Sequence, residues 1–286
     1  MTGFRLPRGG RIDRSRSLRF TFDGRSMEGH PGDTLASALL ANGMSIVGRS
    51  FKYHRPRGIL TAGSSEPNAL VTLGEGARIE PNTRATMVEL TDGLVARSQN
   101  CWPSAAFDIG AVNGLLAPFL SAGFYYKTFM WPAPLWEKLY EPLIRKAAGL
   151  GRASKEPDPD RYEKSWEHAD LLVIGAGPAG LAAALTAGRA GARVILLDED
   201  SEPGGSLLHE TGEVQGRIAA VFLAGIVGEL SGLPNVRLLT RTTAVGWYDD
   251  NVFGAVERVP ADVPDGHAPR ERLWRIVARE AILATG

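Results

Sequence analysis

The stretch LLVIGAGPAGLAAALTAGRAGARVILLDED, residues 171–200, places three glycines between a short apolar run and an Ala- and Leu-rich run. The first run has the pattern of a buried parallel strand, and the second has that of a tightly packed helix. In a dinucleotide-binding turn, Gly175 allows the tight turn, Gly177 lets the backbone approach a diphosphate, and Gly180 lets helix and strand pack closely. The small Ala179 leaves that approach open, and the amides at the helix start face the phosphates. Strand, turn and helix in this order predict a dinucleotide site.

An acidic cluster follows the second apolar run, ARVILLDED. Asp198 lies 23 positions after Gly175, where a carboxylate is expected to meet the ribose hydroxyls of the adenosine half of a dinucleotide. Glu199 and Asp200 add negative charge that repels a 2′-phosphate, so the sequence favours NAD or FAD over NADP. For Glu199 and Asp200 themselves, a solvated acidic turn is as good an interpretation as direct contact.

Later segments extend the predicted nucleotide site. The run EPGGSLL, residues 202–208, has a glycine pair that includes Gly205, where a loop must pass close to the cofactor. Ser206 either offers a hydroxyl there or is an ordinary loop serine. The run VRLLTRTTAVGWYDD resembles a third parallel strand, at whose exit Val245 presents its backbone to adenine or simply packs in the core. A further strand, WRIVAREAILATG, ends at residues 284–286.

The N-terminal part has the pattern of a β-grasp module. Apolar residues at 18, 20 and 22 alternate with polar ones as in a half-buried strand, and Asp23-Gly24 is a type I′ hairpin signal. After a return strand, residues 31–34 (PGDT) supply turn and N-cap chemistry for a helix that Gly43 can end. The runs NALVTL (68–73) and ATMVEL (85–90) predict further strands.

The composition is that of a soluble globular protein. The chain has 286 residues, long enough for two domains, with 44% hydrophobic and 22% charged residues. The formal net charge is zero, yet residues 1–60 hold eleven Arg and Lys against four Asp and Glu. This excess predicts either a basic face for an anionic cofactor or acidic partner, or a solvated surface. The single cysteine, Cys101, fits a reducing compartment, so we expect a cytoplasmic protein.

Metal, membrane and nucleic-acid binding are not expected. The five histidines lack ligand spacing, so no metal site is predicted. The apolar segment IGAVNGLLAPFLSAGFYY, residues 109–126, approaches membrane-spanning length, but Asn113, Pro118 and Ser121 interrupt it. We therefore expect a partly buried connector there.

These patterns predict three parts in an α/β chain with an α+β N-terminal module. A β-grasp, ferredoxin-like module covers residues 1–98, and a Trp- and Pro-rich connector covers 99–165. A Rossmann-type dinucleotide-binding domain covers 166–286. The run EPDPD, residues 156–160, is typical of an exposed linker before this last domain.

Several long strings carry a family resemblance. DLLVIGAGPAGLAAA, VILLDED, EPGGSLL and AILATG resemble the FAD- and NAD-linked two-dinucleotide-binding superfamily. RLPRGGRIDRSRSLRFTFDG, FKYHRPRGILTAGSSEPNALV, AGFYYKTFMWP and YEPLIRKAAGLG are more specific, and the whole chain is similar to the alpha subunit of heterotetrameric sarcosine oxidase. The resemblance implies that this chain carries NAD, that a beta subunit carries FAD and oxidises sarcosine, that FMN lies at the alpha/beta contact, and that gamma and delta subunits complete the assembly. It also implies the products glycine and hydrogen peroxide, with the one-carbon unit passed to tetrahydrofolate or released as formaldehyde.

Carried over by position, the resemblance implies NAD contacts at Ala179, Asp198, Glu199, Asp200, Ser206 and Val245. No acid/base pair or nucleophilic constellation is visible in the sequence, so we expect no catalytic residue here. The flavins would do the chemistry, while this chain binds and orients. The family's alpha subunit continues beyond residue 286, so we interpret the sequence as a truncated form or fragment whose Rossmann-type domain is incomplete at the C-terminus.

The β-grasp module also resembles the [2Fe-2S] module of related amine-oxidising flavoprotein complexes, in which a loop carries a C-x4-C-x2-C pattern. Anchoring the match on RGIL and NALV puts Thr61, Glu66 and Ala69 at those positions, and none supplies a thiolate. Cys101 alone cannot hold a cluster. We therefore predict a module without iron, retained for structure or subunit contact.

Three functions stay open on the sequence. The first is an NAD-carrying alpha chain of sarcosine oxidase or of a related amine- or opine-oxidising complex. The second, a self-sufficient oxidoreductase of the disulfide-reductase type, requires a redox CxxC pair, which a chain with one cysteine lacks. The third is a scaffold with a vestigial nucleotide pocket, whose basic N-terminal face docks a partner subunit.

Overall fold

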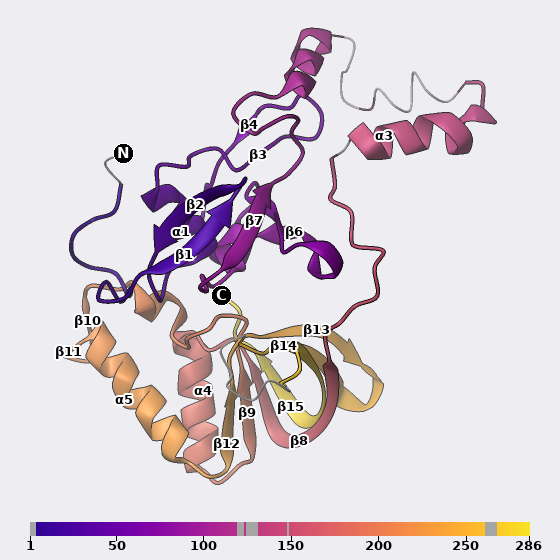
Figure 1. Ribbon diagram of the computed structural model, residues 1–286. Helices are drawn as coiled ribbons and strands as arrows, with labels where there is room; N and C mark the ends of the chain where they lie inside the picture. Colours follow the sequence, from indigo (N-terminus) through magenta and orange to yellow (C-terminus); the bar gives the residue numbers. More distant parts are fainter. Residues whose placement is uncertain (1–3, 119–122, 124–130, 148, 261–267) are drawn as a thin grey trace. The chain divides into compact units, whose positions relative to one another are not determined.

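The computed structural model describes residues 4–118, 123, 131–147, 149–260 and 268–286. The chain divides into two compact units, Met1–Pro159 and Asp160–Gly286. Each unit has its own sheet (Figure 1). The division lies inside the connector expected over residues 99–165.

The first unit is built on a five-stranded sheet with the order β2-β1-β7-β5-β6. Strands β1 (Leu18–Phe22) and β2 (Arg25–Gly29) form the expected hairpin, and Asp23 in its turn has a φ of 50°. Strand β1 also pairs in parallel with β7 (Leu94–Ser98) across the middle of the sheet. The other strands and 3-10 turns of this region are β3 (Gly48–Arg49), β4 (Pro56–Arg57), η1 (Gly63–Ser65), β5 (Leu70–Leu73), η2 (Gly76–Arg78), β6 (Glu80–Arg84) and η3 (Ala85–Met87).

Helix α1 (Leu35–Ala41) packs its apolar face against the residues of this sheet (Figure 1). Its start is fixed by a reciprocal capping box, because the Thr34 side chain accepts from the Ser37 N–H at 3.2 Å while the Thr34 N–H donates to the Ser37 hydroxyl at 3.0 Å. The buried core shared by helix and sheet includes Phe20, Phe22, Leu35, Leu39 and Val71. Full burial of such a side chain stabilises the fold by about 1.5–3 kcal/mol.

The prediction of a strand over residues 85–90 is wrong. Ala85–Met87 form the 3-10 turn η3, and the backbone that follows bonds to the start of α1. The Leu35 N–H donates to the Val88 carbonyl at 2.8 Å, and the Leu90 N–H donates to the Asp33 carbonyl at 2.9 Å. The apolar residues of this run still enter the core. Their backbone, however, forms hydrogen bonds with the start of a helix and not with a neighbouring strand.

The part of the first unit that follows the sheet contains three helical segments among the described residues. Residues Ile109–Leu116 form the 3-10 helix η4, and Trp136–Tyr140 form a π-helical turn, η5, that leads into α3 (Glu141–Ala147). Residues 119–122 and 124–126 of the apolar segment lie outside the described residues. Among the helices that are described, none is long and apolar enough to span a bilayer.

The second unit has a six-stranded sheet with the order β12-β9-β8-β15-β14-β13. Strands β12, β9, β8 and β15 are parallel, as expected for a Rossmann-type domain. Strands β14 and β13 extend the sheet by antiparallel pairing, which the sequence did not predict. The bounds are β8 (Tyr162–Ile174), α4 (Pro178–Arg189), β9 (Val194–Leu197), η6 (Gly205–Leu208), β10 (Glu213–Val214), β11 (Arg217–Ile218), α5 (Ala219–Gly232), β12 (Val236–Leu239), β13 (Thr242–Tyr248), η7 (Asp249–Asn251), β14 (Val252–Arg258) and β15 (Glu271–Leu283).

Both faces of the central strands of this sheet are buried. Helices α4 and α5 lie on one face (Figure 1), where Val173 and Leu196 enter a core with helix residues. The alternate side chains of the same strands, including Leu172, pack on the other face with Phe253 and Trp274 from the antiparallel part. This burial explains why β8 and β9 end as uninterrupted apolar runs, and the topology confirms the predicted fold class.

Candidate functional site

The turn between β8 and α4 brings three backbone segments together. Gly175 has a φ of +105°, and a Cβ added there would overlap the carbonyl of Ala284, at the end of the neighbouring strand β15. A Cβ at Gly180 would overlap the carbonyl oxygen of Gly175 itself. The Gly204 N–H donates to the Ala176 carbonyl at 2.8 Å, which ties the glycine-pair loop to the same turn. The turn is therefore packed against the backbone at the end of β15 at position 175 and against its own backbone at position 180.

Gly177 differs from these two glycines, because the space beside it is open. It is the N-cap of α4 with an ordinary φ of −70°, and a Cβ there would meet no described atom within 4 Å. The N-cap residue is a glycine and makes no side-chain cap, and no side chain of the described residues accepts from the amides of Ala179 and Gly180. Open space beside uncapped amides, at the positive end of a helix dipole, fits the diphosphate of a dinucleotide.

Asp198 directly follows β9 and links the second strand to the glycine turn. Its carboxylate accepts one hydrogen bond from the Ala176 N–H and another from the Asp200 N–H, the latter at 2.9 Å. Its backbone is held as well, since the Thr242 N–H donates to the Asp198 carbonyl at 2.7 Å. The sequence predicted this carboxylate for a ribose, but its bond to the turn was missed, because spacing alone does not show which internal amide lies within reach.

The other predicted contact residues lie on loops around this turn. Glu199 is half-buried and Asp200 is exposed, both in the loop after β9. Gly205 approaches closely, because a Cβ added to it would lie 2.9 Å from the Cα of Gly177. Ser206 is exposed on η6, one residue further along the chain. The structure thus brings the glycine-pair loop next to the glycine turn.

Val245 is placed differently from the expectation. Strand β12 ends at Leu239, and Val245 lies within the antiparallel strand β13, where the register with β14 shifts. The run is divided by a turn at Arg241, which has a φ of 54° and whose N–H donates to the Asp200 carbonyl at 2.8 Å. Both predictions for Val245 are therefore wrong. It does not lie at the exit of a third parallel strand, and with 55% of the residue exposed it is not packed in the core.

The loop of residues 60–69 in the first unit is organised by Glu66, a residue that the sequence singled out only for lacking a thiolate. Glu66 is 1% exposed. One carboxylate oxygen accepts from the N–H groups of Leu60 and Thr61 at 2.8 and 2.7 Å. The other accepts from those of Asn68 and Ala69 at 2.7 and 3.2 Å. Burial opposes ionisation of Glu66, but these four donors outweigh it and lower the pKa below its ordinary value.

The residues of this loop do not fit a [2Fe-2S] cluster. Such a cluster is held by cysteine thiolates. The chain has one cysteine, Cys101, and burial raises the pKa of its thiol. In the loop itself, four backbone N–H groups already bond to the Glu66 carboxylate. Across the residues that the structure describes, no group of three or more His, Cys, Asp or Glu is placed to hold a metal ion.

Glu66→Gln is expected to destabilise the first unit by about 1–3 kcal/mol at pH 7, because the carboxamide nitrogen cannot accept and leaves two partly buried N–H groups without their acceptor. Urea denaturation measures the difference. Since the folded-state pKa of Glu66 is lowered, its contribution is complete above the ordinary value of 4.5 and is lost as the pH falls through the folded value. The gap between wild type and variant should therefore shrink below about pH 4.5. Glu75→Gln, at an exposed acid, is the control, and equal midpoints for Glu66→Gln and wild type would contradict this role.

Gly180→Ala is expected to destabilise the second unit by about 3 kcal/mol or more, because the added methyl overlaps the Gly175 carbonyl oxygen and only a backbone shift relieves it. Gly177→Ala, three residues earlier, should cost no more than about 1 kcal/mol. Thermal denaturation of both variants measures the contrast. Equal losses would show that the turn is not packed against itself.

Comparison with protein families and solved structures agrees with this fold. Residues 15–101 match the family described as a 2Fe-2S iron-sulfur cluster binding domain, and residues 170–231 match the family described as FAD dependent oxidoreductase. L-proline dehydrogenase from P. horikoshii aligns with 96% of the chain, over 41% of its own length, with a TM-score of 0.58 and 19% identity. That likeness shows a shared fold, and the predicted ferredoxin-like module followed by a flavoprotein-type domain is confirmed.

Curated relatives match the whole chain. Sarcosine oxidase subunit alpha from Rhizobium meliloti (strain 1021) is 72% identical over 100% of the chain and 29% of that relative. Sarcosine oxidase subunit alpha from Corynebacterium sp. (strain P-1) is 40% identical over 100% of the chain and 26% of that relative. The chain thus spans less than a third of the length of either relative. The resemblance drawn from the motifs is confirmed, and the chain belongs to the family of sarcosine oxidase alpha subunits.

Proposed function

We propose that this chain binds NAD and serves as part of the alpha subunit of a sarcosine oxidase. One arrangement carries the proposal: the open space at Gly177 and the uncapped amides of α4 lie beside the turn that the Asp198 carboxylate holds. The amides would bind the diphosphate and the carboxylate the adenosine ribose. An ionised carboxylate has about four lone-pair positions, so Asp198 can hold its two backbone donors and still accept from a ribose hydroxyl.

The same arrangement serves the ADP half of NAD and of FAD. We propose NAD on the resemblance to the family, and the three consecutive carboxylates from Asp198 to Asp200 disfavour a 2′-phosphate and hence NADP. Within the proposed contact set, Gly205 and Ser206 would border the diphosphate from the glycine-pair loop. Val245 would approach from β13, which begins where Thr242 bonds to Asp198.

The proposed reaction is the oxidative demethylation of sarcosine to glycine, with oxygen reduced to hydrogen peroxide and the one-carbon unit passed to tetrahydrofolate or released as formaldehyde. In this proposal FAD lies in a beta subunit and FMN at its contact with the alpha subunit, while gamma and delta subunits complete a cytoplasmic complex. Flavins supply the redox chemistry. The residues of this chain bind and orient the nucleotide and are not themselves catalytic.

Gly177→Ala tests the proposed site with little disturbance of the fold. The methyl occupies the space through which a diphosphate would approach the α4 amides, so bound NAD in the complex purified with its partner subunits should fall by about tenfold or more. Nucleotides released by denaturation are identified by chromatography and mass spectrometry. Gly225→Ala, at an equally open glycine on α5, is the matched control.

Asp198→Ala should also reduce bound NAD, and Asp249→Ala, at an exposed acid of the same unit, should not. A thermal scan of each variant separates lost binding from lost folding. Wild-type NAD content in a folded Gly177→Ala or Asp198→Ala protein would refute the proposal. If the wild-type complex releases FAD and not NAD, the site is as proposed but its nucleotide is FAD. If the wild-type complex releases no nucleotide, the scaffold function is favoured.

A further inference from the structure

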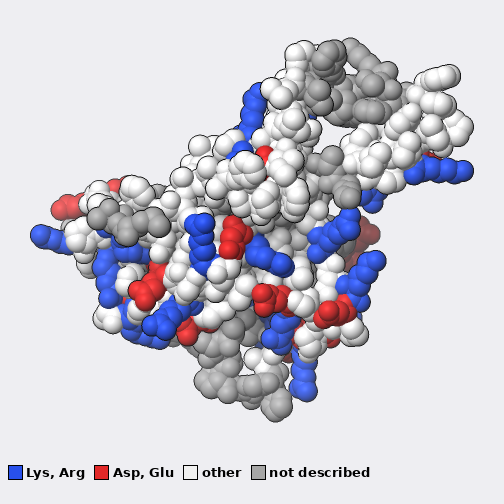
Figure 2. All heavy atoms as spheres, turned by 45° about the horizontal axis from the view of Figure 1, so that its top comes forward, with Lys and Arg blue, Asp and Glu red and all other residues white. Residues whose placement is uncertain are grey.

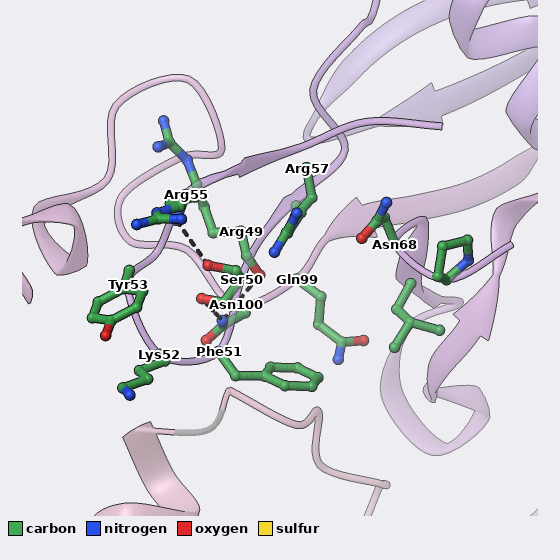
Figure 3. A pocket seen from close by; sticks show the side chains of 13 residues that line it. Arg49, Ser50, Phe51, Lys52, Tyr53, Arg55, Arg57, Asn68, Gln99 and Asn100 are labelled. Atoms are coloured by element: carbon green, nitrogen blue, oxygen red, sulfur yellow. Dashed lines mark hydrogen bonds between the residues drawn. The ribbon is translucent and has the colours of Figure 1, made fainter. Parts of the chain in front are cut away.

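A pocket of about 470 Å³ lies in the first unit, and none of the residues that line it belongs to the contact set proposed for NAD. One side is formed by the segment from Gly48 to Arg57, which contains the β3–β4 hairpin, and Asn68 and Gln99 lie on the other side (Figure 3). Its volume is within the usual range for pockets that bind small molecules. None of the residues that line it is Asp or Glu.

Four basic side chains line this pocket: Arg49, Lys52, Arg55 and Arg57. They belong to the N-terminal segment in which the sequence shows an excess of basic residues. On the face shown in Figure 2, basic and acidic side chains are interspersed, so this excess does not form a continuous basic surface there. The pocket instead gathers four of these charges within nine residues of chain.

The charge of Arg49 is held in place without being neutralised. Its guanidinium donates to the backbone carbonyls of Ala105, His54 and Ala106 at 2.7, 3.0 and 3.0 Å. Three carbonyl dipoles fix the orientation of the group, and its positive charge remains at the base of the hairpin. Asn100 supports the same segment by donating to the carbonyls of Arg49 and Ser50 at 3.0 and 2.9 Å.

Arg55 and Arg57 are exposed, and no carboxylate of the described chain pairs with either. The Arg55 guanidinium and the Lys52 ammonium each lie 4.9 Å from the centroid of the Tyr53 ring. The ring attracts each of these cations. An anion with several oxygens could bond to more than one of the basic side chains that line the pocket.

Neutral donors add to this arrangement. The Ser50 hydroxyl oxygen accepts from the backbone N–H of Arg55 at 2.9 Å, so the hydroxyl proton of Ser50 can still be donated to a ligand. The Asn68 carboxamide forms no hydrogen bond to any described residue. Phe51, which is 48% exposed, supplies an apolar surface at the same pocket.

We propose that this pocket binds a phosphate group, either free phosphate or the phosphate of a small organic ester. The paired N–H donors of a guanidinium group match the oxygens of a phosphate. A phosphate dianion is also attracted more strongly than a singly charged carboxylate to the four basic side chains that line this pocket. A pocket of this volume also has room for a group attached to the phosphate, with Phe51 and Tyr53 as its apolar neighbours.

Isothermal titration of the purified full chain with inorganic phosphate tests the site. Saturable binding with a Kd on the order of 1 mM or tighter is expected at low salt, and added chloride should weaken it. The variant Arg55→Gln/Arg57→Gln should bind phosphate about tenfold more weakly or worse. Arg25→Gln, on β2 outside the pocket, should bind as the wild type does, and thermal denaturation checks that each variant is folded.

The absence of saturable phosphate binding, or equal affinity in the double variant and the wild type, would overturn the proposal. So would binding of acetate as tight as that of phosphate, which would point to carboxylates of a protein partner.

Titration with adenosine monophosphate and with flavin mononucleotide separates the two sources of phosphate. Tighter binding of an ester, lost in Phe51→Ala, assigns the pocket to organic phosphates, and equal affinity assigns it to the free ion. The NAD content of Arg55→Gln/Arg57→Gln should not change, so failure here is distinct from failure of the nucleotide proposal.

Discussion

The second unit depends on the close approach of backbone to backbone at the turn after β8. A side chain at position 180 would overlap the carbonyl oxygen of Gly175, so the first turn of α4 could not pack this close to it. A side chain at position 175 would overlap the carbonyl of Ala284 and displace the end of β15. The two glycines therefore fix where the helix begins relative to two parallel strands. Because the helix starts this close to the strand, its uncapped amides point to the edge where the strands end, and Gly177 leaves that edge open.

Asp198 connects the turn and the loop after β9 by hydrogen bonds within the protein. Its carboxylate bonds to the N–H of Ala176 within the turn and to that of Asp200 within its own loop. A site held in its binding geometry loses less conformational entropy on binding. The carboxylate that would recognise the ribose is thus the group that positions the diphosphate turn, so the two halves of the proposed site are coupled through one side chain.

The sequence predicted what depends on local pattern and missed what depends on distant partners. The glycine turn, the strand before it and the acid at 198 follow from spacing, and the structure forms these elements at those positions. Residues 85–90 have strand-forming side chains, but their backbone bonds to the start of α1, which no local pattern reveals. Val245 was misplaced because the turn at Arg241 depends on its bond to Asp200. The basic pocket likewise needs residues near 50, 68 and 99 to meet, and only the charge excess among them was visible in the sequence.

The two units use opposite solutions for backbone N–H groups that converge in a loop. In the first unit the convergent donors of residues 60, 61, 68 and 69 are satisfied from within, by the carboxylate of Glu66. Every one of those four donors is therefore occupied by a side chain of the same loop. In the second unit no side chain of the described residues accepts from the first amides of α4, and the Asp198 carboxylate bonds to the N–H of Ala176 in the turn before them. Such donors are satisfied by water or by an anion from outside, which is the basis of the dinucleotide site proposed at the start of α4.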